Sequence, residues 1–372
     1  MKILQLGKFY YPVMGGVETV EYDMAEVLNM RGITCDVLCT NIENSTIYEK
    51  INGYNVFRAS SFGEFFSTAI SLSYIRILKE IINNYDVIHV HLPNPLANIA
   101  LMLCNTNDKK IVVHWHSDII KQKYLLKIYR PFQTWLLNRA DVIIGTSIKY
   151  LNESKELVRY TEKCHPVPIG IDTLRLKSKP ELLDKLRNQF PEKKIVFTLG
   201  RHVYYKGFEY LIDAAKYLND EYIILIGGVG PLFNELKIKI DDNGLNDKVR
   251  LLGRIEEEDL GSYYELCDLF CLPSILKSEA FGVVQIEAMS FGKPVVATKI
   301  NGSGTSWVNE DNISGINVDI MDAHGLAEAI KYITGDETRY HKFSSGAKKR
   351  FKLHFERNVM LDKIIDIYSS FN

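Results

Sequence analysis

The sequence predicts an α/β protein with two doubly wound domains, each built on a parallel sheet. Three observations lead to this fold class. The chain has 372 residues, which suggests two domains at ~100–200 residues each. Residues 2–40 follow the order strand, Gly-rich turn, helix, strand, and doubly wound folds begin in this way. The same alternation starts again at residue 193.

The first half of the chain alternates apolar runs with helical stretches. Residues 2–7 are an apolar run that ends in Gly7, as expected for a buried parallel strand. After Gly15-Gly16, apolar residues recur every three or four positions and predict a helix that ends at Gly32. Further strands are expected at 33–40, 86–91, 110–116 and 141–147.

The second half repeats this arrangement. We expect a strand at 193–200, a helix at 207–218, and further strands at 222–228, 249–254, 269–274 and 294–299. Between the halves, residues 165–183 contain three prolines and a basic run, which predicts a linker. The first domain is therefore expected over 1–172 and the second over 185–354.

Composition excludes several classes of protein. With 46% hydrophobic and 24% charged residues, the chain is neither disordered nor fibrous. The net charge of −1 gives no general attraction to nucleic acid, so no nucleic-acid partner is expected. No uncharged apolar run approaches the ~18–20 residues of a membrane-spanning helix, and the N-terminal apolar stretch is too short for a signal peptide. We expect a cytoplasmic protein.

The cysteines fit a reducing compartment. Six in 372 residues are too few for a disulfide scaffold. The pairs Cys35/Cys39 and Cys267/Cys271 lie inside apolar runs, and no further close pair completes a zinc set. Buried thiols are therefore expected at these four positions.

Two basic residues follow the first strand of the second half. Arg201 lies at the strand end, and Lys206 comes five positions later, next to Gly207 and a helix start. Two cations at a strand end suit a diphosphate. The alternative interpretation is a solvated basic turn.

Two Gly-rich loops also follow strands. Gly15-Gly16 precedes a helix, where backbone amides can approach a phosphate, although a simple turn explains the pair equally well. In the GGVGP loop at 227–231, Gly228 could let a base or ribose pack against backbone, or it could serve a tight turn.

The segment SEAFGVVQIEA carries two carboxylates, Glu279 and Glu287. If a helix begins near Gly282, Glu279 lies in the loop before it and Glu287 lies inside it. Carboxylates in an apolar setting need hydroxyl or amide donors. They could hold sugar and ribose hydroxyls, while the first free amides of the helix face phosphate. The alternative is one acid at the helix start and one on the surface.

Four histidines alternate along two strands. His114 and His116 face one way at the end of one expected strand, and His89 and His91 repeat the pattern on another. A His-x-His pair can bind a metal, but no nearby carboxylate or Cys cluster completes a site. A histidine at a strand end can instead bond a substrate hydroxyl. We expect at least two of the four to be structural.

The absent motifs narrow the chemistry. The chain has no P-loop, no Gly-x-Ser-x-Gly elbow and no Asp-x-Asp metal clamp. A leaving diphosphate would then be neutralised by protein cations and helix ends. No metal or other cofactor is expected.

Together, these motifs resemble the retaining glycosyltransferases of family four, also called group 1, which have the GT-B fold of two Rossmann-like domains. The resemblance covers nearly the whole chain, from FYYPVMGGVE through VVHWHSD, GRHVYYKG and SEAFGVVQIEA to SGTSWVNEDNISGINV. The stretches HLPNPLAN and HWHSDIIKQKYLLKIYRPFQ look closest to bacterial enzymes of O-antigen or exopolysaccharide synthesis.

The resemblance implies a first domain that binds the acceptor and a second that binds the nucleotide sugar. His116 would lie beside the transferred sugar, and Gly15 and Gly16 would close over the diphosphate. The donor site of the second domain would consist of Arg201 and Lys206 at the diphosphate, Glu287 at the ribose, Gly228 in its loop, and Glu279 with the amides of Phe281, Gly282 and Val283 at the sugar and its phosphate. The catalytic residues would be His116, Arg201, Lys206 and Glu279.

The chain departs from the family pattern in two places. The usual Pro-Asn-Gly-Val/Ile-Asp reads Pro-Ile-Gly-Ile-Asp at 168–172, so a role for that Asn is lost. The late Gly-Gly-x-x-Glu loop reads Asn-Gly-Ser-Gly-Thr-Ser at 301–306, which puts contacts from that loop in doubt. The resemblance also implies a last helix, roughly 355–372, that packs on the first domain.

The implied reaction transfers a hexosyl unit with retained anomeric configuration and without a metal. The donor would be a nucleotide-diphosphate sugar, GDP-mannose or a UDP-hexose. The acceptor would be a polyprenyl-diphosphate-linked saccharide in O-antigen-type synthesis. Alternatives are a nucleotide-sugar epimerase on the same fold and a non-catalytic sugar-binding protein. A nicotinamide dehydrogenase lacks its dinucleotide fingerprint.

Residues 109–139 are unusually basic. Seven cations and one acid, Asp118, give 7 − 1 = +6 in this segment. The interleaved apolar and aromatic side chains suit docking on the inner face of the cytoplasmic membrane, or a helix with a solvated charged face. The cations are Lys109, Lys110, Lys121, Lys123, Lys127, Arg130 and Arg139.

Overall fold

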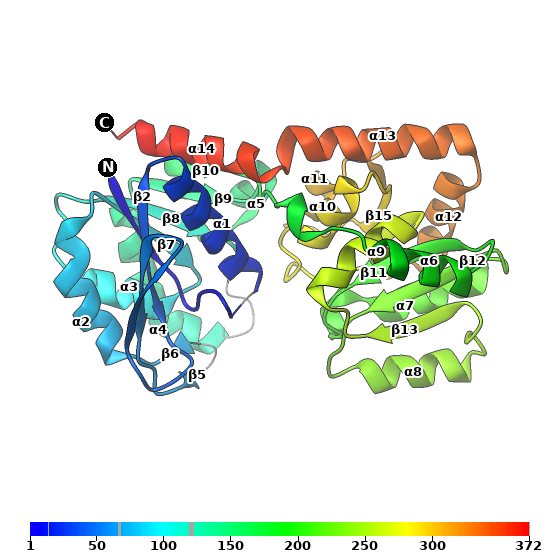
Figure 1. Ribbon diagram of the computed structural model, residues 1–372, viewed down its shortest axis with the longest axis horizontal. Coiled ribbons are helices and arrows are strands. Elements are labelled where there is room, and N and C mark those ends of the chain that lie inside the picture. The colour runs from blue at the N-terminus through cyan, green and yellow to red at the C-terminus, as the bar shows by residue number, and fades with distance from the viewer. Residues whose placement is uncertain (14, 66–67, 119–122, 372) are drawn as a thin grey trace. The chain divides into compact units, whose positions relative to one another are not determined.

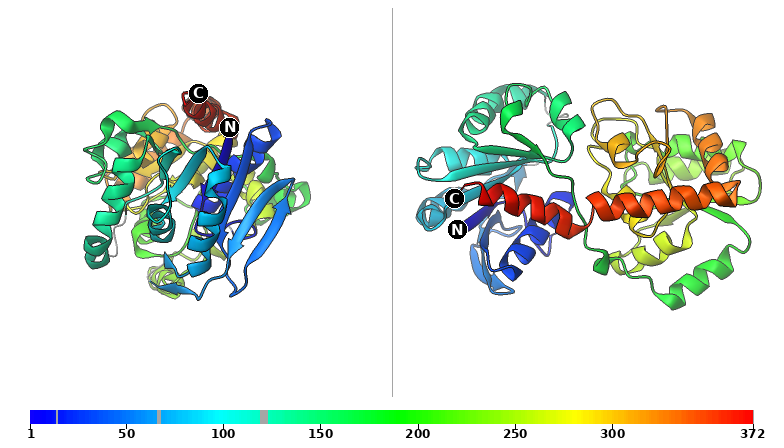
Figure 2. Two further views of the ribbon diagram at one scale, coloured as in Figure 1. Left: turned by 90° about the vertical axis from the view of Figure 1, so that its left-hand side faces the viewer. Right: turned by 90° about the horizontal axis from the view of Figure 1, so that it is seen from above.

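The computed structural model describes residues 1–13, 15–65, 68–118 and 123–371 (Figure 1; Figure 2 gives two further views). The chain divides into two compact units. The first comprises Met1–Gly170 and Arg357–Asn372, and the second comprises Ile171–Glu356. Each unit has a mainly or wholly parallel sheet with helices packed on it, so the predicted α/β class is confirmed.

The sheet of the first unit has eight strands in the order β10-β9-β8-β7-β1-β2-β4-β3. All neighbours pair in parallel except β3 and β4. The central strands are apolar runs, buried because helices lie on both faces. The bounds are β1 Lys2–Leu6, β2 Thr34–Thr40, β3 Ile47–Ile51, β4 Tyr54–Ala59, β7 Val87–Leu92, β8 Lys110–Trp115, β9 Val142–Gly145 and β10 Cys164–Pro166, with a separate pair β5 Glu64–Phe65 and β6 Thr68–Ala69.

The helices of the first unit come from both ends of the chain. Helix α14, at the end of the chain, packs against α1, where Arg31 pairs with Asp362 at 2.5 Å. Helices α2, α3 and α4 contact one another in sequence order. The bounds are α1 Gly16–Met30, α2 Leu72–Ile81, α3 Pro95–Met102, α4 Lys123–Arg139, α5 Ile148–Glu153 and α14 Arg357–Ser369, with 3₁₀ turns η1 Ile82–Asn84 and η2 Thr161–Lys163.

The sheet of the second unit has six parallel strands in the order β13-β12-β11-β14-β15-β16. The carboxyl ends of parallel strands meet at one edge of a sheet, so the loops after β11, β12 and β14 are neighbours. The bounds are β11 Lys194–Leu199, β12 Tyr222–Gly227, β13 Val249–Gly253, β14 Leu269–Leu272, β15 Val295–Thr298 and β16 Gly315–Val318.

Helices cover both faces of this second sheet (Figure 1). One face forms a buried hydrophobic core with α7, α8, α12 and α13. The other packs Phe197 and Phe270 against Tyr264 of α9. The bounds are α6 Pro180–Gln189, α7 Phe208–Ala214, α8 Phe233–Asp242, α9 Leu260–Leu266, α10 Val283–Ser290, α11 Thr305–Val308, α12 Ala323–Thr334 and α13 Glu337–His354, with 3₁₀ turns η3 Thr173–Arg175, η4 Tyr204–Lys206, η5 Ala215–Tyr217 and η6 Glu257–Asp259.

Two sequence expectations are refined, and one is confirmed. The expected linker at 165–183 is partly regular structure, because β10 reaches Pro166 and α6 begins at Pro180. The expected helix at 207–218 is α7 followed by the 3₁₀ turn η5. The four cysteines in close pairs are free buried thiols, as predicted. No described helix is both long and apolar enough to cross a bilayer.

Candidate functional site

The two predicted site residues Lys206 and Glu279 form an ion pair in the second unit. Lys206 ends the turn η4 after β11, and Glu279 lies in the loop between β14 and α10. The Nζ atom of Lys206 is 2.6 Å from Oε2 of Glu279, and both side chains are nearly buried. The two strand ends therefore bring a cation and a carboxylate together, although they are 73 positions apart in the sequence.

Glu279 is held on several sides. The Oγ atom of Ser274, after β14, donates to Oε2 of Glu279 at 2.9 Å. The Oγ atom of Ser303 donates to the backbone carbonyl of Glu279. The backbone amide of Gly304 donates to the carbonyl of Ala280 at 2.8 Å. The 301–306 loop, whose role the sequence left in doubt, thus fixes the backbone at Glu279.

Glu287 lies in the second turn of α10, as expected from the sequence. The hydroxyl of Tyr264 donates to its Oε2 atom at 2.5 Å. Burial raises the pKa of Glu287, while the Tyr264 hydrogen bond and nearby Lys206 lower it by less. The result is a carboxylate with one oxygen occupied by a fixed donor.

Helix α10 begins at Val283, with Gly282 as its N-cap. Gly282 has φ of +76°, and a Cβ there would lie 2.8 Å from Cδ2 of Leu272. Phe281 is buried, with its ring 6.0 Å from that of Phe355. The predicted amides therefore lie at the N-terminus of a helix. The backbone that leads into this helix is held by a buried aromatic ring and by glycine, the residue suited to this positive φ.

The Gly-rich loop after β12 packs against the segment that carries Arg201. Gly228 has φ of +112°, and a Cβ on it would lie 2.0 Å from the carbonyl oxygen of Gly200. The amide of His202 donates to the carbonyl of Val229 at 3.0 Å. Gly228 is thus required for close backbone contact that positions the Arg201 segment. The Arg201 side chain is exposed.

Gly15 and Gly16 belong to the first unit, at the start of α1. Gly15 is the N-cap and Gly16 the first helical residue. Both are exposed, and a Cβ on Gly16 would meet nothing within 4 Å. This helix start is therefore exposed, but a Cβ on Gly15 would lie 2.5 Å from Oε2 of Glu18, so a carboxylate of the chain itself lies close to it.

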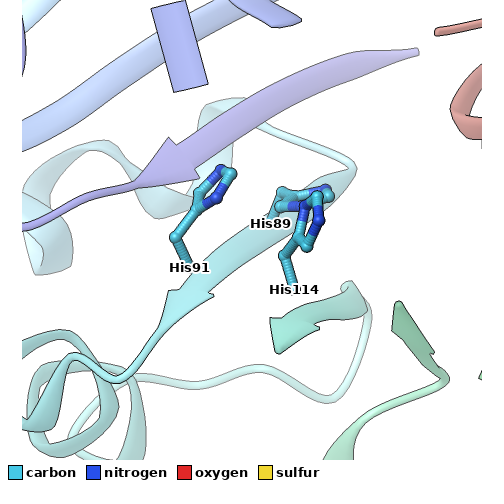
Figure 3. Close-up of side chains that lie close together, drawn as sticks. All are labelled: His89, His91 and His114. Atoms are coloured by element: carbon cyan, nitrogen blue, oxygen red, sulfur yellow. The ribbon is translucent and has the colours of Figure 1, made fainter. Parts of the chain in front are cut away.

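All four histidines are buried in the first unit and bonded into two pairs. Figure 3 shows His89, His91 and His114 grouped on one side of the sheet. His91 bonds His116 at 2.9 Å between Nδ1 and Nε2. His89 bonds His114 at 3.2 Å and the hydroxyl of Tyr368 at 2.7 Å. Burial lowers the pKa of His116 to about 3, so its imidazole is neutral.

The positive charge of the basic segment 109–139 is partly neutralised by acidic residues just outside it. Lys109 pairs with Asp108 at 3.0 Å, while Lys110 and Arg139 both pair with Asp141. These acids flank the segment, so the excess of +6 overstates the charge at its two ends. Lys121 lies outside the described residues, as do the side chains of Lys123, Tyr124, Leu125 and Leu126.

Three residues of the site were not singled out by sequence: Tyr264, Ser274 and Ser303. Ser274 ends the expected strand at 269–274, so its place beside other strand ends was a usable signal. Nothing in the sequence next to Tyr264 or Ser303 indicates a site, because only the packing of α9 and of the 301–306 loop brings these residues to Glu287 and Glu279.

Comparison with known proteins identifies the class. The model of the family "Glycosyl transferases group 1" matches residues 182–350, and that of "Glycosyltransferase Family 4" matches residues 14–175. The chain therefore belongs to the group 1, family 4 glycosyltransferases. It is 31% identical to O-antigen chain mannosyltransferase C of Escherichia coli, over 100% of this chain and 98% of the relative. It is also 31% identical to the D-rhamnosyltransferase WbpZ of Pseudomonas aeruginosa, over 95% and 92%.

Solved structures share the fold, which is GT-B as predicted. HepE of Anabaena, solved with UDP, superposes with a TM-score of 0.79 at 22% identity and full coverage of both chains. Sucrose-phosphate synthase of Thermosynechococcus elongatus superposes with a TM-score of 0.80 at 21% identity, covering 100% of this chain and 98% of the other.

Proposed function

We propose that this glycosyltransferase moves a hexosyl unit, with retention of anomeric configuration, from a nucleotide-diphosphate sugar to a lipid-linked saccharide in O-antigen-type synthesis. The buried pair of Lys206 and Glu279 at the strand ends of the second unit is the observation that carries the proposal. The pair consists of a cation that can bind a diphosphate and a carboxylate that can bind a sugar hydroxyl, in direct contact with each other.

The names of relatives support the choice of donor and acceptor. The two 31% identical relatives are a mannosyltransferase and a rhamnosyltransferase, and the first builds an O-antigen chain. A further relative, 26% identical over 96% of this chain and 94% of its own, is a galactosyltransferase of Escherichia coli whose named acceptor is a diphosphoundecaprenol-linked sugar. GDP-mannose is therefore our first donor, with UDP-hexoses second.

The ion pair suggests how the donor is received. Lys206 and Glu279 pair with each other in the structure. When the diphosphate enters, Lys206 and exposed Arg201 contact its oxygens, and Glu279 is released to accept a sugar hydroxyl while Ser274 holds it in place. Glu287 accepts hydrogen bonds from the ribose hydroxyls, and the amides at the start of α10 face a phosphate of the donor.

The proposed reaction proceeds on one face of the sugar. The bond between the anomeric carbon and the donor phosphate oxygen breaks, and the acceptor oxygen bonds to the same face of that carbon. The acceptor proton passes to the departing phosphate oxygen. Arg201, Lys206 and the α10 N-terminus stabilise the charge that develops on the leaving diphosphate. No metal is needed in this scheme.

Membrane contact is proposed through the exposed side of α4. Ile128 is 70% exposed, and Lys127, Arg130 and Pro131 border a shallow hollow of about 560 Å³. An exposed apolar side chain between cations suits an anionic bilayer surface. In liposome flotation, the variant Lys127→Glu/Arg130→Glu should lose binding to anionic vesicles, whereas Lys79→Glu on α2 should not. Flotation that ignores anionic lipid would contradict the proposal.

The first experiment is a thermal-shift panel of GDP-mannose, UDP-glucose, UDP-galactose and UDP-GlcNAc with EDTA present. Ligand at 100 times its Kd stabilises the fold by ~2.7 kcal/mol. A shift with one base identifies the donor class and supports metal-free binding. Transfer to a lipid-linked acceptor, with the new anomeric centre read by NMR, then tests retention. Free nucleotide with a 2-epimerised sugar would instead indicate an epimerase.

A further inference from the structure

The hydrogen bonds around His116 determine which of its ring nitrogens carries the proton. Neutral imidazole has one N–H donor and one bare acceptor nitrogen. His116 bonds His91, and the Nε2 atom of His91 bonds Oε1 of Gln5 at 2.8 Å. Gln5 lies on β1 and His91 on β7, and His116 directly follows β8, the other neighbour of β7.

The series of hydrogen bonds starts at Oε1 of Gln5, an atom that can only accept. The Nε2 atom of Gln5 lies 3.1 Å from the backbone carbonyl of Glu21 on α1. If the Gln5 amide were flipped, two carbonyl oxygens would face each other. The amide NH₂ therefore points to Glu21, and Oε1 points to His91. An amide oxygen cannot donate, so Nε2 of His91 must carry a proton.

The remaining protons follow in turn. Burial lowers the pKa of His91 well below its usual range, so the ring is neutral and its Nδ1 atom is bare. The bond between that Nδ1 and Nε2 of His116 then requires a proton on Nε2 of His116. Because His116 is also neutral, its own Nδ1 atom is left with a lone pair.

We propose that Gln5 and His91 are positioning residues that hold His116 in its Nε2–H form, so that Nδ1 acts as a hydrogen-bond acceptor toward a hydroxyl of the transferred sugar. This rests on the proposed function, because an enzyme that transfers a sugar supplies the hydroxyl that Nδ1 would accept. A site with a fixed acceptor favours a sugar whose hydroxyl is free to donate. A sugar that lacks this hydroxyl leaves the acceptor unpaired.

Other titratable groups pack against this chain without changing the assignment. Oε1 of Glu21 is 3.9 Å from Nε2 of His91, beyond hydrogen-bond range, and burial raises the pKa of Glu21, which favours its neutral form. His114 is stacked on His116 with ring centroids 4.2 Å apart. His114 is hydrogen-bonded to His89, and His89 to Tyr368 of α14. These bonds involve none of the ring nitrogens that link Gln5, His91 and His116.

A metal ion is the competing occupant of this cluster, since possible ligand atoms of His89, His91 and His114 lie within 4.8 Å of one another. An imidazole binds a metal in the ring plane, along its lone pair. The rings of His91 and His114 lie in planes only 25° apart, with centroids separated by 5.2 Å. Both nitrogens of His91 are also engaged. This arrangement favours hydrogen bonding over a shared ion.

Nitrogen-15 NMR of the imidazoles tests the assignment directly, because protonated and bare ring nitrogens have well-separated shifts. Full-length protein labelled at histidine should show His116 protonated at Nε2. His91→Phe should remove this preference. His91→Asn, whose amide oxygen can replace Nδ1 of His91, should retain it, and so should His114→Asn. A wild-type His116 protonated at Nδ1, or an imidazolium at His91, would overturn the proposal.

Transfer assays on the same variants test the role of the tautomer. We expect His91→Phe to lose about tenfold in kcat/KM, and His91→Asn to recover most of it while both retain the thermal stability needed for the assay. Equal losses in both variants would mean that His91 acts only in packing. If wild-type protein transfers no sugar, the proposed function fails, while the spectrum still decides the tautomer.

Discussion

The ammonium of Lys206 and the carboxylate of Glu279 lie 2.6 Å apart, with about nine-tenths of each side chain buried. Nearly buried charges tolerate the loss of a partner poorly, because the remaining charge is then desolvated and unpaired. In the proposed function, an anionic donor that binds Lys206 would have to replace this pairing with a new one for each charge.

Replacing Lys206 should abolish most turnover. We expect Lys206→Ala to lower kcat by ~10²–10³-fold, since one cation that stabilises the leaving group is removed. The double variant Lys206→Ala/Glu279→Gln should recover stability without recovering activity. Lys216→Ala, which removes an exposed lysine paired with Asp213 at 3.0 Å, is the matched control. Near-normal steady-state rates in Lys206→Ala would contradict this role.

The hydroxyl of Tyr264 should set the acidic limit of donor binding. Burial raises the pKa of Glu287, and the Tyr264 hydrogen bond partly lowers it again. In the proposed site, the ionised carboxylate of Glu287 is the better acceptor of hydrogen bonds from the ribose hydroxyls. The KM for the donor should therefore rise as the pH falls toward this raised pKa. In Tyr264→Phe the pKa rises further, and the increase in KM should begin at a higher pH. Identical KM profiles between pH 5 and 8 would exclude the effect.

A side chain at the start of α10 should be costly. Gly282 and Gly244 both have positive φ, but a Cβ would contact neighbours only at Gly282. Gly244→Ala should therefore lower the free energy of unfolding by ~1–2 kcal/mol from backbone strain alone. Gly282→Ala should cost more and should also weaken donor binding. Urea denaturation and thermal shift with donor measure the two effects, and equal stability losses would argue against crowding at Gly282.

Glu21 should make the protein less stable as pH rises. Its side chain is fully buried, and burial raises its pKa well above 4.5. Between 4.5 and the folded-state pKa, the unfolded chain releases a proton that the folded chain retains. The free energy of unfolding then falls by ~1.4 kcal/mol per pH unit. Glu21→Gln should remove this slope, so the difference between the two stability curves should grow with pH. Parallel curves would show that Glu21 is ionised in the folded state.

The strands were predictable where burial on both faces produces continuous apolar runs, as in β1, β7 and β12. The hairpin β3–β4 was missed because the side chains of β3 are exposed and its sequence, IYEKI, has no apolar run. Its turn residues, Asn52 and Gly53, both have positive φ, and Asn-Gly is a strong hairpin signal that could have revealed it.

The candidate site was predictable only in part. Strand-end position and Gly spacing pointed to Lys206, Glu279 and Glu287, because those features are local in sequence. The ion pair, the Tyr264 hydrogen bond and the coupling of His116 to Gln5 depend on which strands are neighbours. Strand order is set by the packing of whole helices, and a single segment does not reveal it.

The first unit is completed by the last helix of the chain. Met360, Leu361, Ile364 and Tyr368 of α14 are buried there, and the Tyr368 hydroxyl reaches His89. During synthesis, domains usually fold in order from the N-terminus. Here the first unit is built from two separate segments, and the second of them follows Ile171–Glu356, which forms the second unit as one continuous segment. The core of the first unit therefore depends on a segment that is synthesised after the whole of the second unit, and a chain cut before α14 would lose both this buried helix face and the Tyr368 partner of His89.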